Sequence, residues 1–132
     1  MNLISEDIAG LLASDSSLGL TEGIDLFVGN IPNTVKGFCV VVYDYPGEGP
    51  DAWVDTERNN IQVNIIGQKL DYQHAGEAAN NIMAFLHGQA NFELNGTFYL
   101  SIFALRGLNF IGFDENDRPM FGLSFVVSRR TN

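Results

Sequence analysis

Residues 38–44 read Phe-Cys-Val-Val-Val-Tyr-Asp, and Phe38 to Tyr43 form the longest unbroken apolar run in the chain. β-Branched and aromatic side chains favour strands, and a run without polar alternation is typical of a strand buried on both faces. The run is far too short to cross a bilayer as a helix. We therefore expect residues 38–44 to form a strand buried on both faces.

Upstream of this strand the sequence predicts one short helix and one short extended segment. Residues 5–14 begin with a possible N-cap, Ser5, followed by two acids that favour the positive end of a helix. The apolar positions of this segment share one helical face, and they are Ile8, Leu11 and Leu12. Residues 25–29 (Asp-Leu-Phe-Val-Gly) then read as a short extended segment that ends in a turn.

Downstream of the strand comes Pro46-Gly47-Glu48-Gly49-Pro50-Asp51, which neither a helix nor a central strand tolerates. We expect a long loop here, at about residues 45–59. Long loops in compact domains are usually functional or disordered. The next segment, 61–65, alternates apolar and polar residues and predicts another strand.

The second half of the chain predicts a long helix followed by a hairpin and a closing strand. Residues 72–87 have apolar side chains at spacings of three and four, with Asp71 placed to cap the helix and Gly88 to end it. Asn95-Gly96 is the strongest short hairpin signal, and a final strand is expected over 121–128 after a polar turn.

The predicted order is therefore α-β-β-β-α-β-β-β, which indicates an α+β fold. We expect a mostly antiparallel (mixed) sheet of five to six strands with two helices packed on one face. No repeat or linker divides the sequence, so residues 1–132 are expected to form a single domain. Two helices cover only one face of such a sheet, and the apolar surface left over favours self-association.

Composition limits the classes of function. The chain has 132 residues with 16 acidic and 7 basic side chains, for a formal charge of −9, which argues against adhesive binding to nucleic acid. Cys39 is the single cysteine, so an internal disulfide and a multi-cysteine metal site are excluded. The N-terminal residues lack the features of a signal peptide, so we expect the protein to work in the compartment where it is made or to leave it by a route unrelated to secretion.

The sequence contains no constellation typical of catalysis, cofactor binding or metal binding. His74 and His87 have no neighbour at ligand spacing, and residues 114–117 lack the glycine and distal glutamate of a calcium loop. We therefore expect a protein that is not an enzyme, with no catalytic residues, cofactor or metal. One enzymatic alternative uses carboxylates of the 44–57 segment, with Asp44 and Asp55 as its candidates.

Several strings, taken in chain order, resemble a known family. They are Asp25-Leu-Phe-Val-Gly-Asn-Ile-Pro32, Val40-Val-Val-Tyr-Asp-Tyr-Pro-Gly47, Leu86-His-Gly88, Asn95-Gly-Thr-Phe-Tyr99 and Gly112-Phe-Asp-Glu-Asn-Asp-Arg118. This order resembles the minor capsid or tail-terminator proteins of tailed bacteriophages, and the resemblance covers roughly residues 5–128.

The resemblance implies a structural protein of the virion: a tail terminator that forms a hexameric ring, caps the tail tube and joins it to the neck and head. Its partners would be copies of itself, the tail tube protein and a neck or head-completion protein. DNA would pass through without specific binding, no membrane would be involved, and the subunit would reside in the host cytoplasm during assembly. Another neck ring or head-completion protein is an alternative, as is a small dimeric ligand-binding domain with a pocket lined by Tyr43, Tyr72 and Tyr99.

If the chain is a ring subunit, we expect the long loop, the chain end and one helix residue to contact partners. Loops and termini are often ordered by binding, and aromatic side chains in loops often anchor interfaces. The predicted interface residues are Glu48, Asp51, Trp53, Asp55, Glu57, Phe85, Arg129 and Arg130.

Overall fold

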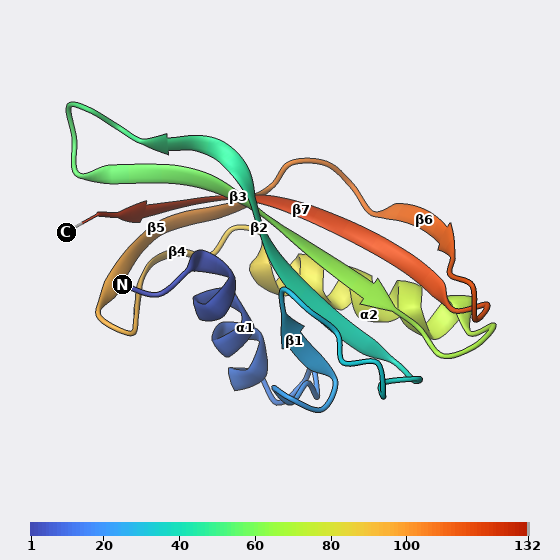
Figure 1. Ribbon diagram of the computed structural model, residues 1–132. Helices are drawn as coiled ribbons and strands as arrows, with labels where there is room; N and C mark the ends of the chain where they lie inside the picture. Colours follow the sequence, from blue (N-terminus) through green and yellow to red (C-terminus); the bar gives the residue numbers. More distant parts are fainter. Residues whose placement is uncertain (132) are drawn as a thin grey trace.

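The computed structural model describes residues 1–131 as two helices and a seven-stranded mixed sheet (Figure 1). The strands lie in the order β1-β2-β3-β7-β5-β4, with β6 beside β7. The elements are α1 (Ile4–Ser14), β1 (Leu26–Val28), β2 (Cys39–Pro50), β3 (Thr56–Ile66), α2 (Tyr72–Leu86), β4 (Ala90–Leu94), β5 (Thr97–Ala104), β6 (Asn109–Phe113) and β7 (Pro119–Arg130).

Three long antiparallel strands form the centre of the sheet. β3 pairs with β2 on one side and, along its whole length from Thr56 to Ile66, with β7 on the other. β5 and β6 follow one another along the far edge of β7, since β5 pairs with its C-terminal half and β6 with its N-terminal half. β1 pairs with β2 in parallel, so the sheet is mixed, as predicted.

Both helices lie on the same side of the sheet (Figure 1). Their buried apolar side chains, such as Ile8 of α1 and Ile82 of α2, pack with the alternate residues of the strands that face them. On β7 these are Phe121, Phe125 and their neighbours two residues apart. The expected α+β fold, with two helices on one face of a mixed sheet, is confirmed.

The expected N-cap of the first helix is wrong. α1 begins at Ile4 and its N-cap is Leu3, whose backbone N–H donates to the Glu6 carboxylate at 2.8 Å. Ser5 instead lies inside the first turn and is buried. Its hydroxyl and backbone N–H donate to Asp44 of β2 at 2.5 and 3.1 Å, so a tertiary hydrogen bond replaces the local cap.

The long loop expected at about 45–59 is mostly strand. β2 continues to Pro50 and β3 begins at Thr56, so only residues 51–55 lie outside the ladder. The prolines are tolerated because β1 pairs with β2 only as far as Val42, which leaves the rest of β2 as an edge. A register shift between Tyr45 and Gly49 accommodates the extra residues as a bulge.

The other local predictions agree with the structure. The Asp71 carboxylate accepts the backbone N–H of His74 at 3.3 Å and caps α2. Asn95 and Gly96 both have positive φ, as a tight hairpin turn requires. Cys39 is buried, and burial raises the pKa of its thiol. No helix within residues 1–131 is long and apolar enough to span a membrane.

Packing of α2 on the sheet predicts a large effect of Ile82→Ala. The Ile82 side chain is 1% exposed and lies in the core, so its truncation leaves a cavity and lowers the free energy of unfolding by about 2–5 kcal/mol. Urea denaturation followed by circular dichroism measures the change. Ala84→Ser, on the exposed side of the same helix, is the control and changes stability by less than about 0.5 kcal/mol. Equal midpoints for the two variants would contradict this packing.

Candidate interaction surface

Residues 48–55, which we call the arm tip, form the turn between β2 and β3 and the end of β2. Trp53 is 93% exposed and Val54 beside it is 55% exposed. The backbone of the turn is fixed nonetheless: the Asp51 carboxylate accepts the N–H of Trp53 at 2.8 Å, and the Asp51 N–H donates to the Thr56 carbonyl at 2.8 Å. The turn projects from one end of the sheet (Figure 1), so the arm tip presents an indole to solvent from an ordered backbone.

A buried ion pair holds the base of the arm. Arg129 of β7 is 8% exposed, and its Nε donates to the carboxylate of Glu57, the second residue of β3. Its Nη1 donates to the backbone carbonyl of Asn2 at 2.8 Å and to the hydroxyl of Tyr99 at 3.4 Å. Burial disfavours the charged form of Arg129, but the hydrogen bonds to Glu57 and Tyr99 outweigh it and raise the pKa.

Asp7 of α1 completes this network from the helical side. Its carboxylate is 1% exposed and accepts hydrogen bonds from the Tyr99 hydroxyl, from Asn95 Nδ2 at 2.8 Å and from Asn2 Nδ2 at 3.0 Å. Burial is the main cause that raises the pKa of the Tyr99 phenol above its usual range, and the hydrogen bond to Asp7 is the second cause. The network therefore joins the chain start, α1, β3, the β4–β5 hairpin and β7.

The sheet side away from the helices, which we call the open face, has no helix over it (Figure 1). Rows of paired residues cross it from β2 to β5, because directly paired residues share a face. Polar side chains occupy the centre of these rows, and Tyr45 and Phe103, both more than half exposed, flank them. The rows include Tyr43, Tyr45, Asn60, Gln62, Ser124, Val126 and Phe103.

A hollow of about 140 Å³ opens on this face between β2 and the segment that follows β5. Gly122 helps to shape it, since a Cβ at that position would lie 3.2 Å from Ile111 Cδ1 and 3.7 Å from Gln62 Nε2. No carboxylate lines the hollow. Its lining residues are Tyr45, Gln62, Leu105, Arg106, Asn109, Gly122 and Ser124.

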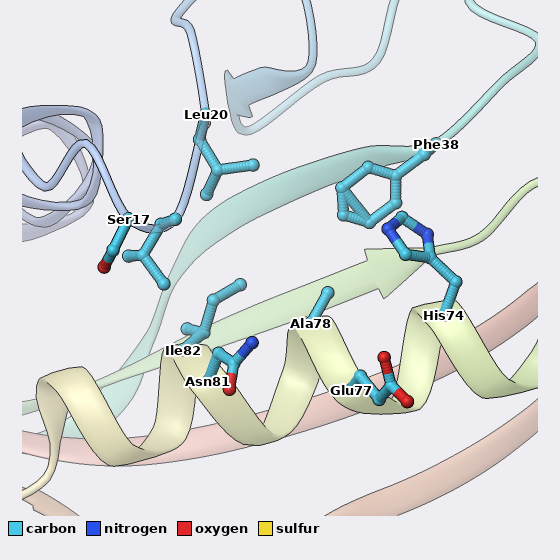
Figure 2. A pocket seen from close by; sticks show the side chains of 9 residues that line it. Ser17, Leu20, Phe38, His74, Glu77, Ala78, Asn81 and Ile82 are labelled. Atoms are coloured by element: carbon cyan, nitrogen blue, oxygen red, sulfur yellow. The ribbon is translucent and has the colours of Figure 1, made fainter.

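A second pocket, of about 290 Å³, lies between α2 and the loop after α1 (Figure 2). Its walls combine apolar side chains such as Ile82 and Leu20 with His74 and Glu77 of α2. The His74 ring packs edge-on against Phe38, with ring centroids 5.1 Å apart. Ser17 and His74 lie at opposite ends of the pocket, so the two do not form a nucleophile–base pair (Figure 2).

The other candidate groups have structural partners. His87 Nδ1 accepts the backbone N–H of Ala104 at 2.9 Å. Within residues 1–131, no group of three or more His, Cys, Asp or Glu side chains is placed to hold a metal ion. Asp114 closes the polar turn: burial opposes its ionisation, but hydrogen bonds from Arg118 and the Asn116 N–H outweigh this and lower its pKa.

Neither of the alternative sites is assembled. The three tyrosines of the ligand-pocket alternative lie apart: Tyr99 is in the buried network, Tyr72 packs on Phe121 and Tyr43 is on the open face. For the enzymatic alternative, Asp44 accepts both Ser5 donors and shares a pocket of about 410 Å³ with Glu57, whose carboxylate is paired with Arg129, while Asp55 lies at the arm tip.

The structure separates the predicted interface residues into two groups. Glu48, Asp51, Trp53 and Asp55 are exposed at the arm tip, and Arg130 is exposed with its guanidinium over the Phe98 ring. Glu57 and Arg129 pair with each other, and Phe85 packs half-buried against the core. Partner contacts by these eight residues stay a prediction. The hollow around Arg106 was not predicted from the sequence, although polar alternation in residues 60–64 indicated that one face of β3 is not core.

The buried network predicts that Tyr99→Phe lowers the free energy of unfolding by about 1–3 kcal/mol, because Asp7 loses a buried donor. Chemical denaturation at neutral pH measures the loss. Tyr45→Phe is the matched control: its ring is 55% exposed, and removal of its hydroxyl costs less than about 0.5 kcal/mol. Equal effects of the two variants would contradict a stabilising role for the network.

A comparison of wild type with Tyr99→Phe over a range of pH tests the raised pKa of Tyr99. The folded-state pKa lies above the value of 10.0 for an unperturbed tyrosine, so the stabilisation is fully present below pH 10 and is lost as the pH rises further. The stability difference between wild type and Tyr99→Phe should shrink above pH 10, by up to about 1.4 kcal/mol per pH unit. A difference that stays constant from neutral to strongly alkaline pH contradicts the raised pKa.

Comparisons with solved structures agree with this fold. A chain of the solved "Virion of native gene transfer agent (GTA) particle" superposes with a TM-score of 0.73 at 16% identity, covering 96% of this chain and 94% of that chain. A second solved structure superposes with a TM-score of 0.62 at 17% identity, covering 97% of both chains. At these identities the likeness shows the fold.

A match to a family model identifies the family of this chain, although no curated protein matches it. The family model described as "Bacteriophage tail terminator protein" matches residues 9–131, which is nearly the whole chain. The resemblance seen in the sequence is thereby confirmed, and this family is a structural one of the phage virion. The chain belongs to the bacteriophage tail terminator family and is a structural protein of the phage tail.

Proposed function

We propose that this chain is the tail terminator itself: copies of it close into a ring, with six subunits, that caps the tail tube and joins it to the neck and head. The family match over residues 9–131 carries this proposal. The ring would form in the host cytoplasm during assembly and remain in the virion. Its partners would be the tail tube protein and a neck or head-completion protein.

The shape and charge of the subunit support a ring. Both helices cover one sheet face, and the other has no helix over it and exposes the apolar side chains of Tyr45, Phe103 and Leu105. Such a surface on a small domain usually marks a protein interface. The net charge of −9 suits a ring around DNA, because like charges discourage DNA from sticking to its walls during passage.

A neck ring or head-completion protein of the head–tail junction is the second candidate function. The similar gene transfer agent chain is described as part of a whole virion, with no position within it, so the likeness is compatible with either place. The two candidates differ in where the ring binds. A terminator contacts the end of the tail tube, whereas a head-completion protein contacts the head side of the junction.

The proposal predicts that the purified protein forms a closed ring of six copies. Native mass spectrometry over a concentration series should show a species six times the 14.5 kDa subunit, and negative-stain images should show a central hole. Cryo-electron microscopy of the particle should then place this ring at the upper end of the tail. A discrete dimer at all concentrations, with no ring in the particle, would contradict the proposal.

A further inference from the structure

The arm tip is acidic as well as apolar. Residues 48–55 contain Glu48, Asp51 and Asp55 and no basic residue. Glu48 makes only a loose, exposed ion pair with Arg58, with 3.7 Å between the charged atoms. Between these acids stands Trp53, which has the largest exposed fraction of the large hydrophobic side chains. An exposed Trp in an ordered turn resembles the aromatic anchors that dominate binding energy at interfaces.

The hollow on the open face has the opposite charge to the arm tip, whereas the rest of that face is mixed, since Arg58 pairs with Glu48 and Glu93 lies beside Phe98 in the β4–β5 ladder. Two arginines, Arg58 of β3 and Arg130 of β7, face away from the helices. No carboxylate shares this side on β3, on β7 or on the part of β2 that ends at Tyr45. Arg106 adds a third guanidinium at the hollow, which no carboxylate lines. In a chain of net charge −9, a hollow with one guanidinium and no carboxylate in its lining is a local reversal of charge.

We propose that the arm tip of one copy docks on the open face of a second copy, with Trp53 in the hollow beside Arg106. A guanidinium over an indole ring is a favourable cation–π contact, and Leu105 and Tyr45 supply apolar walls. The side-chain amides of Gln62 and Asn109 offer oxygen acceptors for the indole N–H. Asp51 and Asp55, two residues from Trp53 on either side, then lie near Arg106. This inference rests on the proposed ring and names the contact that closes it.

The hollow cannot be filled by the arm tip of its own subunit. The tip extends beyond the last β2–β3 pair, Pro50 with Glu57, whereas Gln62 of the hollow lies five residues further along β3, about 16 Å away. Within the subunit Trp53 remains 93% exposed. The two surfaces differ from each other, so the contact is heterologous, and repetition of it around an axis gives a ring.

Trp53 is the single tryptophan of the chain, so its fluorescence reports directly on the contact. Dilute wild-type protein should emit as an exposed indole. Emission should shift to the blue, with loss of quenching by acrylamide, over the same concentration range in which native mass spectrometry shows association. Arg106→Glu should associate at least tenfold more weakly and should keep exposed-indole emission throughout that range. Lys69→Glu makes the same change of charge elsewhere and is the control.

Mixing two defective variants tests the direction of the contact. Trp53→Ala lacks the anchor and Arg106→Glu lacks the receiving face, so each alone should remain monomeric. Together they should form a 1:1 dimer and no ring, because one intact arm meets one intact hollow. Ile24→Ala, which truncates a side chain that is 70% exposed and outside the arm, should form rings as the wild type does. Circular dichroism and thermal unfolding verify that each variant is folded.

The outcomes distinguish this contact from the ring itself. Rings formed by both Trp53→Ala and Arg106→Glu would overturn the contact and leave the proposed ring intact. If both variants form rings but fail to join tails, the arm binds another tail protein, and docking between copies is again overturned. Wild-type protein that neither associates nor forms a ring in the particle would overturn both proposals.

Discussion

The fold depends on one buried polar network that joins the start of the chain to its last strand. The Arg129 guanidinium, the Tyr99 hydroxyl and the Asp7 carboxylate are buried, the Glu57 carboxylate is largely buried, and each has partners among the others. Among the described residues no buried side-chain nitrogen or oxygen lacks a hydrogen bond. Removal of Glu57 costs up to about 3–5 kcal/mol, because the Arg129 guanidinium is then left buried without its ionic partner. The network also joins α1 and the β4–β5 hairpin to the strands that carry the arm, so the helix-covered side is fixed near the arm base.

The sequence predicted the class of fold because periodicity reports which side chains are buried. The apolar run at 38–43, the stripe of α2 and the Asn95-Gly96 turn all depend on short-range physics, and each prediction was confirmed. The long loop was predicted wrongly, because prolines break a central strand but are tolerated on an edge, and edge position is a tertiary property. The cap at Ser5 failed for the same reason, since Asp44 is a partner 39 residues away.

The candidate site was only partly visible in the sequence. Trp53 and the acids around it stood out because a large aromatic among charges is unusual at any position. The receiving hollow did not, because Tyr45, Arg106 and Gly122 come from three segments that only the β2–β3–β7 register and the turn after β5 bring together. Arg129 and Glu57 looked like surface charges for a related reason. Their burial depends on a pairing across 72 residues that no local pattern encodes.

The asymmetry of the subunit links the fold to assembly. A sheet with helices on one face and none on the other has two unlike sides, and its arm projects from one end (Figure 1). Identical copies that meet through unlike surfaces cannot stop at a two-fold dimer, so they either close into a ring or grow into a filament. A rigid arm base favours closure, because the angle between neighbours is then set by the β-ladder and not by a flexible loop. The buried ion pair at that base would therefore help to determine the number of subunits in the ring.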